Sequence, residues 1–454
     1  YVLDEPTIGL HPRDNTMLLD TLRKLEEKGN TVVVVEHDEE TIRRAEHVID
    51  LGPGAGARGG RIVAEGRVTD LLDNPDSVTG RALARPMSHP RAGKRRPVDT
   101  GLAEAKLKIV GASSNNLKGL DVDIPLGRLV CVTGVSGSGK STLVSDVLHT
   151  GLHTLLAKTP RDTKRRKSRT SLHGCGAICG WEGIGRVLEV DQTPIGRTPR
   201  SCPATYVGFW NHIRKLFAGT PEANLRGYKP GRFSFNTGDG RCDACEGQGV
   251  RRIEMSFLPD VQVRCETCDG ARFNRETLEI EFKGRNIGEV LAMPVDEAVE
   301  FFSAQPAVHH ALTLMQAVGL GYLTLGQQSP TLSGGEAQRI KLVTELAKAR
   351  PATRPRQGSK PTLYILDEPT VGLHMADVER LVQVLHRLVD AGHTVLIIEH
   401  NLDIIAEADW VIDLGPEGGD GGGELCVAGP PEHVVKAARR SHTGKALRSV
   451  LSRG

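Results

Sequence analysis

The chain has 454 residues, and its 58 basic side chains nearly balance its 56 acidic ones, so net charge alone indicates no partner. This length allows two or three domains with cores of their own. The sequence has no apolar run of about 18 residues or more, which argues against a membrane span, and its first residues lack the features of a signal peptide. We therefore expect a soluble cytoplasmic protein in which any nucleic-acid surface is a local patch.

A long-period repeat organises the chain. The sequence YVLDEPTIGLH at Tyr1 returns as YILDEPTVGLH at Tyr364, which is 363 positions later. The same offset relates GNTVVVVEH to GHTVLIIEH and VIDLGPGAG to VIDLGPEGG. Continuous apolar runs such as TLYIL and TVLIIE indicate buried strands, and residues 376–388 between them have helical spacing. This alternation predicts a parallel sheet with crossover helices.

The repeat divides the chain into three predicted segments. Residues 1–84 are expected to be the C-terminal remnant of a first module, and residues 106–454 a second module. Residues 85–105 are expected to be a linker, because Arg85–Thr100 is rich in proline and basic residues and has no periodicity. Another basic run, Lys158–Arg169, indicates an exposed loop, which is either a solvated charge cluster or a phosphate contact.

A glycine-rich loop lies within the second module. Residues 134–143 read GVSGSGKSTL, which is the pattern G-x-x-x-x-G-K-S between an apolar strand and a predicted helix. Backbone N–H groups of such a loop surround phosphate oxygens, and the helix N-terminus adds a positive end. We expect Lys140 to reach the β- and γ-phosphates of ATP and Ser141 to ligate Mg²⁺. The nucleotide-binding residues predicted in this loop are Gly134, Gly137, Gly139, Lys140, Ser141 and Thr142.

Two acidic residues end the apolar strand LYIL of the second copy. Asp367 fits the carboxylate that holds Mg²⁺ in phosphate-loop enzymes. Glu368 follows it, where it can orient or deprotonate an attacking water. In register with Lys140, this pair predicts nucleotide hydrolysis.

Three further motifs resemble those of ABC-type ATPases. Residues 332–338, LSGGEAQ, resemble the signature, in which Ser333, Gly334 and Gly335 at a helix N-terminus would bind the γ-phosphate held by a different module. His400 matches the switch histidine, and Gln192 matches the Q-loop glutamine. This resemblance implies an α/β fold with a mainly parallel sheet and a helical signature region.

Four cysteines between the phosphate loop and the signature form two C-x-x-C pairs. Cys242 and Cys245 are separated from Cys265 and Cys268 by 19 residues, which fits a closed tetrahedral Zn²⁺ site with a structural role. A reduced thiol set or a redox pair is the alternative. The partly alternating residues 250–257 indicate a hairpin on this zinc module, and nearby basic residues interleave with Tyr228 and Phe233. These two aromatic residues either face DNA or belong to a core.

The motifs in this order resemble the UvrA family. The segments that carry the resemblance are GVSGSGKSTL (134–143), DQTPIGRTPRSCPATY (191–206), GYKPGRFSFN (227–236), CDACEGQG (242–249), FNRETLEI (273–280), LSGGEAQRIKL (332–342) and LYILDEPTVGLH (363–374). The resemblance implies ATP-dependent recognition of damaged double-stranded DNA in nucleotide excision repair. It also implies a zinc-bearing DNA-binding insertion at about 225–285, dimer formation and delivery of damage to a UvrB-like partner.

The chain departs from that family because its first copy lacks a phosphate loop and a signature. We expect it to pair with an N-terminal half or a second copy, and to bind ATP weakly and hydrolyse it poorly alone. A paralogue that binds DNA or protects against a drug outside excision repair is the alternative. A transporter ATPase is disfavoured by the zinc pattern, and a J-protein-like chaperone by the phosphate loop.

Overall fold

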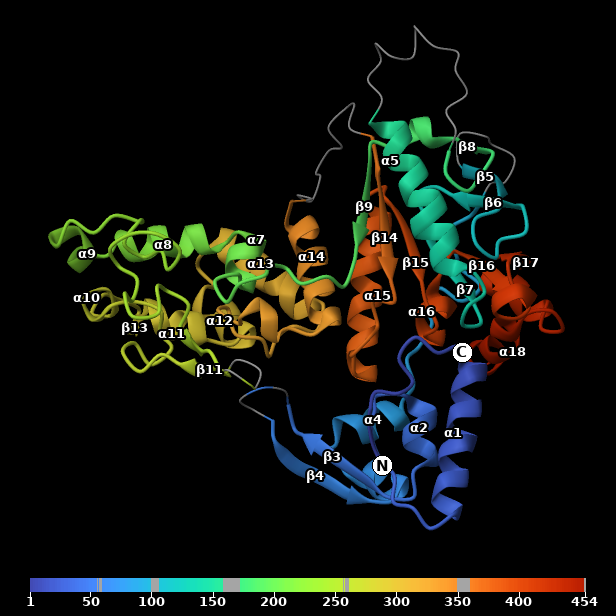
Figure 1. Ribbon diagram of the computed structural model, residues 1–454, viewed down its shortest axis with the longest axis horizontal. Coiled ribbons are helices and arrows are strands. Elements are labelled where there is room, and N and C mark those ends of the chain that lie inside the picture. The colour runs from blue at the N-terminus through green and yellow to red at the C-terminus, as the bar shows by residue number, and fades with distance from the viewer. Residues whose placement is uncertain are drawn as a thin grey trace, which may run out of the picture. The chain divides into compact units, whose positions relative to one another are not determined.

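A computed structural model describes residues 1–54, 56, 59–98, 106–157, 172–255, 257, 261–348 and 360–452 (Figure 1). The predicted basic loop at 158–169 lies outside these residues. The chain forms two compact units: unit 1 comprises Tyr1–Pro53, Gly60–Asp191 and Pro351–Gly454, and unit 2 comprises Gly54–Gly59 and Gln192–Arg350. No helix in the described ranges is long and apolar enough to span a membrane.

Unit 1 contains a six-stranded sheet in the order β17-β16-β7-β15-β14-β9. Neighbouring strands are parallel except for β16 and the edge strand β17. The strands are β7 (Leu129–Gly134), β9 (Arg186–Val190), β14 (Thr362–Asp367), β15 (Thr394–Ile398), β16 (Trp410–Gly415) and β17 (Glu424–Gly429). β7 and β15 are buried along their whole length, which explains their continuous apolar sequences. The predicted parallel sheet is confirmed.

Helices and a second sheet cover this central sheet. One hydrophobic core joins alternate residues of its strands to the helix that follows the phosphate loop and to an antiparallel sheet, β6-β5-β8. That helix is π-helical over Thr142–His149 and continues as α5 (Thr150–Leu156), and the strands are β5 (Lys106–Ala112), β6 (Leu120–Pro125) and β8 (Ala177–Cys179). The predicted helix at 376–388 is α15 (Met375–Asp390), which packs on β15 and β7. The remaining helices of this module in unit 1 are α16 (Leu402–Glu407), α17 (Pro431–Lys436) and α18 (His442–Leu451).

The first copy of the repeat folds as the second does. β1 pairs in parallel with β2, and Asp4 lies opposite Val35 as Asp367 lies opposite Ile398. The hairpins β3–β4 and β16–β17 have the same register and the same irregularity after the aspartate. The elements are β1 (Val2–Asp4), α1 (Pro12–Glu27), β2 (Val33–Val35), α2 (Glu39–Arg44), β3 (Val48–Gly52), β4 (Arg61–Gly66), α3 (Val68–Asp73) and α4 (Val78–Ala84).

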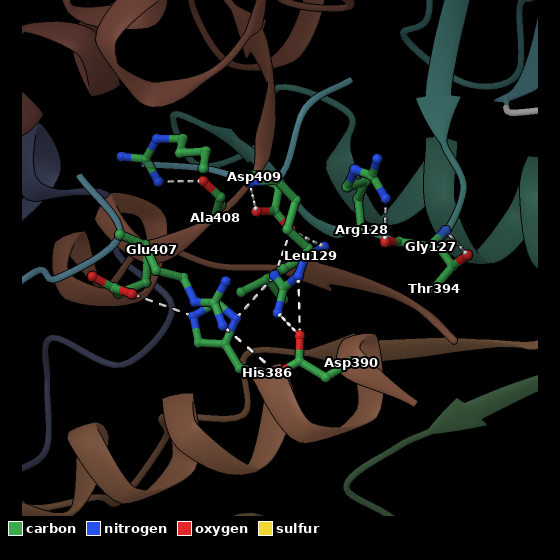
Figure 2. A network of polar contacts seen from close by, with 12 residues as sticks. Gly127, Arg128, Leu129, His386, Asp390, Thr394, Glu407, Ala408 and Asp409 are labelled. Atoms are coloured by element: carbon green, nitrogen blue, oxygen red, sulfur yellow. Dashed lines mark hydrogen bonds and ion pairs between the residues drawn. The ribbon is translucent and has the colours of Figure 1, made fainter. Parts of the chain in front are cut away.

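The segment between the two copies carries no helix or strand over its described part, residues 86–98. It is fixed to unit 1 by charged side chains. Arg96 contacts Asp390 at 2.6 Å and Asp409 at 2.8 Å, and its Nη1 lies 3.3 Å from Nδ1 of His386. The other ring nitrogen of His386, Nε2, lies 3.2 Å from Glu407. Figure 2 shows the side chains of His386, Asp390, Glu407 and Asp409 together. The segment is therefore anchored along its path.

Unit 2 is mainly helical and contains the cysteine insertion. Its helices are α7 (Pro203–Val207), α8 (Trp210–Ala218), α9 (Pro221–Leu225), α10 (Arg275–Leu278), α11 (Ile287–Ala292), α12 (Val295–Phe301), α13 (Pro306–Ala317) and α14 (Gly334–Lys348). β10 (Val250–Ile253) pairs with β11 (Val261–Arg264), which confirms the predicted hairpin, and β12 (Glu281–Phe282) pairs with β13 (Arg285–Asn286). Phe233 is fully buried against Phe217, so it belongs to the core and does not face DNA.

Candidate functional site

The phosphate loop begins where β7 ends. Gly134, Gly137 and Gly139 all have positive φ, and a Cβ at Gly134 would lie 2.0 Å from the carbonyl oxygen of Leu414. Glycine is therefore required for the close approach of the loop to β16. The Nζ atom of Lys140 donates to the carbonyl oxygens of Gly134 and of its neighbour in sequence, both at 3.0 Å. Its ammonium group is thus held inside the loop.

Burial tunes the chemistry of this loop. Desolvation lowers the pKa of Lys140, although acidic neighbours, Glu368 first among them, favour its charged form. The hydroxyl of Ser138 is buried without a hydrogen-bond partner among the described residues, so it is available to a ligand of the loop. Ser141 and Thr142 begin the following helix, and Thr142 accepts a hydrogen bond from Asn115 at 3.1 Å.

Strand β14 delivers the two acidic residues to the same edge of the sheet. Asp367 is its last residue, and burial raises the pKa of this carboxyl group. Glu368 follows with φ of 43°, a conformation that costs energy in a non-glycine residue, and its N–H donates to Ile398 at 2.9 Å. Burial, then Glu399 and Asp367, raise the pKa of Glu368 to about 7, against the opposing effect of Lys140. A carboxylate with this pKa is suited to accept a proton near neutral pH.

His400 follows β15 and lies beside Glu368. Its Nε2 is 3.8 Å from Oε1 of Glu368, and neither ring nitrogen has a hydrogen-bond partner in the described part of the chain. Burial, Lys140 and His11 lower the pKa of His400 to about 2, so the ring is neutral. The structure therefore places Lys140, Asp367, Glu368 and His400 at one edge of the sheet, as the motifs predict.

The first copy of the repeat contributes residues that the motifs did not reveal. Ser136 of the phosphate loop donates from its hydroxyl to the Gly9 carbonyl oxygen and from its N–H to Asp14, both at 3.3 Å. A Cβ at Gly9 would lie 3.3 Å from Oε2 of Glu368. The loop that follows the first LDEP sequence thus lies against the predicted nucleotide site of the second copy. The sequence repeat could have indicated this contact, because the LDEP sequence occurs once in each copy.

The remaining predicted nucleotide residues lie in unit 2. Ser333 caps α14: its hydroxyl accepts from Glu336 N at 3.2 Å, and Glu336 accepts from Ser333 N at 2.7 Å. Gly334 and Gly335 form the first turn of this helix, and a Cβ at Gly334 would lie 3.1 Å from Oε1 of Gln192. Unit 2 therefore brings Gln192 next to the signature helix N-terminus.

The four predicted metal ligands form one buried cluster. The Sγ atoms of Cys242, Cys245, Cys265 and Cys268 lie within 4.8 Å of one another. Cys242 and Cys265 are 4.0 Å apart, and Cys245 and Cys268 are 3.7 Å apart. A tetrahedral Zn²⁺ with Zn–S bonds of about 2.3 Å places sulfurs about 3.8 Å apart. The donor set and its spacing fit zinc.

No family model matches this sequence. Curated proteins match it along its whole length, however. It is 53% identical over 453 residues to UvrABC system protein A of Haemophilus influenzae and 54% identical over 456 residues to that of Bradyrhizobium diazoefficiens. All of this chain is covered in both cases, with 46% and 44% of the two relatives. The chain thus spans about half the length of the curated relatives it matches.

A solved structure agrees. The structure of UvrA2 from Deinococcus radiodurans matches 99% of this chain and 52% of its own length, with a TM-score of 0.84 and 47% sequence identity. The predicted fold, an ABC-type α/β ATPase fold with a mainly parallel sheet and a four-cysteine module, is confirmed. Over its whole length the chain is homologous in sequence and fold to UvrABC system protein A.

Proposed function

We propose that this chain supplies the second ATPase module of a UvrA-like protein, which couples ATP hydrolysis to recognition of damaged double-stranded DNA in nucleotide excision repair. The observation that carries the proposal is the arrangement of Lys140, Glu368 and His400 at one sheet edge, with Glu368 poised to ionise near pH 7. The similarity to UvrABC system protein A over the whole chain supports the same function.

The chain's own residues account for a hydrolysis mechanism. When ATP binds, Lys140 exchanges its two carbonyl partners in the loop for β- and γ-phosphate oxygens. Backbone N–H groups of residues 137–142 donate to the same phosphates. Glu368 accepts a proton from the water that attacks the γ-phosphorus. His400 is neutral and keeps one ring N–H, which it can donate to a γ-phosphate oxygen. Ser141 and Asp367 are the residues that would hold Mg²⁺, which would supply neutralisation of phosphate charge when bound.

The signature residues Ser333, Gly334 and Gly335 complete a nucleotide site of a different module in this proposal. Their helix N-terminus offers N–H groups to a γ-phosphate. The site of Lys140 in turn needs a signature from elsewhere. We therefore propose that the active assembly includes an N-terminal half or a second copy of this chain, and that the chain acts in the cytoplasm.

DNA contact is assigned to the cysteine insertion. Zn²⁺ bound by the four cysteines would fix the two C-x-x-C turns and with them the hairpin β10–β11. Arg251 on strand β10 is exposed, and Phe257, between β10 and β11, is 98% exposed. An exposed basic side chain and an exposed aromatic one on the same hairpin are suited to backbone phosphates and bases of DNA. Delivery of the damaged site to a UvrB-like partner is proposed for the complete assembly.

The test is ATP hydrolysis measured against protein concentration, with intact duplex, lesion-bearing duplex or no DNA. Lys140→Ala is the control for the site. We expect a low rate for the chain alone, a rise when an N-terminal half is added, and stronger stimulation by the lesion. A first-order rate that is high and unchanged on dilution would refute the need for a partner. Equal stimulation by both duplexes would refute damage recognition.

A further inference from the structure

In unit 1, two equivalent series of hydrogen bonds connect the two copies of the repeat. In one, Nε2 of His11 lies 3.1 Å from the hydroxyl of Thr443, which donates to Oδ1 of Asp413 at 2.6 Å. In the other, Nε2 of His374 lies 3.2 Å from the hydroxyl of Thr79, which donates to Asp50 at 2.8 Å. Each histidine belongs to one copy, and each Thr–Asp pair belongs to the other.

The hydrogen-bond partners fix the tautomer of His11. The N–H of Arg13 donates to Nδ1 at 3.1 Å, so Nδ1 carries no proton. The hydroxyl of Thr443 uses its only proton on Asp413, so it must accept from Nε2–H of His11. Burial is the main cause that lowers the pKa of His11, to about 4, so the ring is neutral at pH 7. His374 has the same pattern, because Ala376 N donates to its Nδ1 at 3.2 Å.

The series of hydrogen bonds that starts at His11 continues to the phosphate loop. Oδ1 of Asp413 also accepts the hydroxyl of Thr133 at 2.7 Å. Thr133 is fully buried on β7 and directly precedes Gly134, the first glycine of the loop. One carboxylate oxygen therefore ties His11, through Thr443, to the strand that carries the loop.

The ring of His11 also contacts the catalytic histidine. The rings of His11 and His400 meet edge to face, with centroids 5.9 Å apart. His11 is 1% exposed, and it lies two residues after Gly9, which approaches Glu368. Since neither ring nitrogen of His400 is hydrogen-bonded, packing has to set the orientation of its ring.

We propose that His11 is a positioning residue for the second copy's ATPase site, which it holds through the Thr443–Asp413–Thr133 relay and through its ring contact with His400. This inference rests on the proposed ATPase function. His11 touches no substrate; it sets the ring of His400 and the position of the loop relative to Glu368. Loss of the relay should therefore slow turnover more than it weakens ATP binding.

The kinetic test uses the whole chain together with a separately added N-terminal half of a UvrA-like protein. We expect His11→Asn and Thr443→Val to lower kcat at least about tenfold and to change the KM for ATP by less than about threefold. Thr443→Ser retains the hydroxyl and should recover most of kcat. His11→Gln retains an N–H that can reach Thr443 but loses the ring contact with His400, so it should recover only part of kcat. The double variant His11→Asn/Thr443→Val should be no slower than His11→Asn alone, because both substitutions break the same series of hydrogen bonds.

The second relay provides a matched control within the chain. His374→Asn and Thr79→Val remove the corresponding hydrogen bond on the side of the first copy, where it is part-buried. When ATP hydrolysis is measured at the site of Lys140 alone, these variants should keep kcat within about twofold of the wild-type value. Equal losses from both relays would mean that they merely hold the copies together and would overturn the positioning role. So would an unchanged kcat in His11→Asn.

Histidine side-chain NMR tests the relay without ATP turnover. In the whole chain labelled with ¹⁵N-histidine, His11 should show the neutral Nε2–H tautomer at pH 7. Thr443→Val should shift the ring signals of both His11 and His400, while Thr79→Val should leave them in place. Unmoved signals in Thr443→Val would overturn the relay. If wild type and Lys140→Ala hydrolyse ATP equally, the proposed function falls, and these spectra still decide the relay.

Discussion

The Oε1 atom of Glu368 lies 3.8 Å from Nε2 of His400, and the His400 ring has no other polar contact among the described residues. The two side chains follow neighbouring parallel strands, β14 and β15, whose carboxyl ends share one edge of the sheet. They differ in their response to burial, since burial raises the pKa of Glu368 to about 7 and lowers that of His400 to about 2. The carboxyl group of Glu368 therefore titrates near pH 7, beside an imidazole that is already neutral there.

The pH dependence of hydrolysis should follow Glu368. A base must be ionised to accept a proton, so kcat/KM, which reports the nucleotide-free protein, should rise with pH, with a midpoint near 7, and then level off. Glu368→Gln should lower kcat by about 10²-fold or more while ATP binding is retained. Steady-state rates between pH 5.5 and 9, in the assembly with the N-terminal half, measure both effects. A kcat/KM that is constant from pH 6 to 8 would contradict this assignment.

Zinc should be bound in a ratio of one per chain and should stabilise unit 2. Cys242→Ser removes one of four ligands, so the zinc content should fall well below that ratio and the insertion should unfold at lower denaturant. Cys426→Ser is the matched control, because that thiol is half-buried in unit 1 and lies outside the cluster. Elemental analysis after dialysis, with urea unfolding, provides the readout. Full zinc retention by Cys242→Ser would rule out the four-thiolate site.

Hydrogen exchange should separate the two copies of the repeat. β14 and β15 lie inside a six-stranded sheet, whereas among the described strands β1 and β2 pair only with each other. Val2 is 80% exposed and Val33 is 51% exposed, while their counterparts in the second copy are buried. Backbone amides of β1 and β2 should therefore exchange at least about 100-fold faster than those of β14 and β15. Equal protection of the two pairs in mass-spectrometric exchange would contradict this expectation.

The predictable part of the site is the part encoded by short spacings. The positions of Lys140, Asp367 and Glu368 follow from a loop or strand end that local sequence specifies, and the buried strands followed from their apolar runs. The four-cysteine cluster was equally predictable from the sequence, since it forms as soon as the two C-x-x-C turns come close to each other. The division of residues 1–105 into a remnant and a linker remains a prediction.

The unpredicted part depends on contacts between distant segments. His11 and Thr443 are 432 residues apart. His11 ends the repeated sequence YVLDEPTIGLH but had no predicted role, and Thr443 lies outside the motifs. The repeat itself concealed the relay, because Asp50 and Asp413 are 363 positions apart but Thr79 and Thr443 are 364 apart. Burial of Phe233 also could not be read locally, since an aromatic residue between basic ones fits a core as well as a DNA surface.

The anchoring of the segment before residue 106 should depend on pH through His89. Its ring lies 3.3 Å from Asp403 and 3.4 Å from Glu407. Burial alone would lower the pKa of His89, but the two carboxylates outweigh it and raise the pKa to about 9. Its stabilisation is therefore complete below the ordinary histidine pKa of about 6.5 and is lost as pH rises through 9.

Replacement of His89 tests this linkage. Because His89→Leu leaves two carboxylates without their cation, we expect it to lower the free energy of unfolding at pH 6 by about 3 kcal/mol. The loss should shrink towards pH 9.5, where most of the wild-type ring population is neutral. His47→Leu is the matched control, since the His47–Glu65 pair is more than half exposed and should contribute less than about 1 kcal/mol. Urea unfolding at pH 6 and pH 9.5 measures the difference, and an effect of His89→Leu that is equal at both pH values would exclude a charged His89 as the anchor.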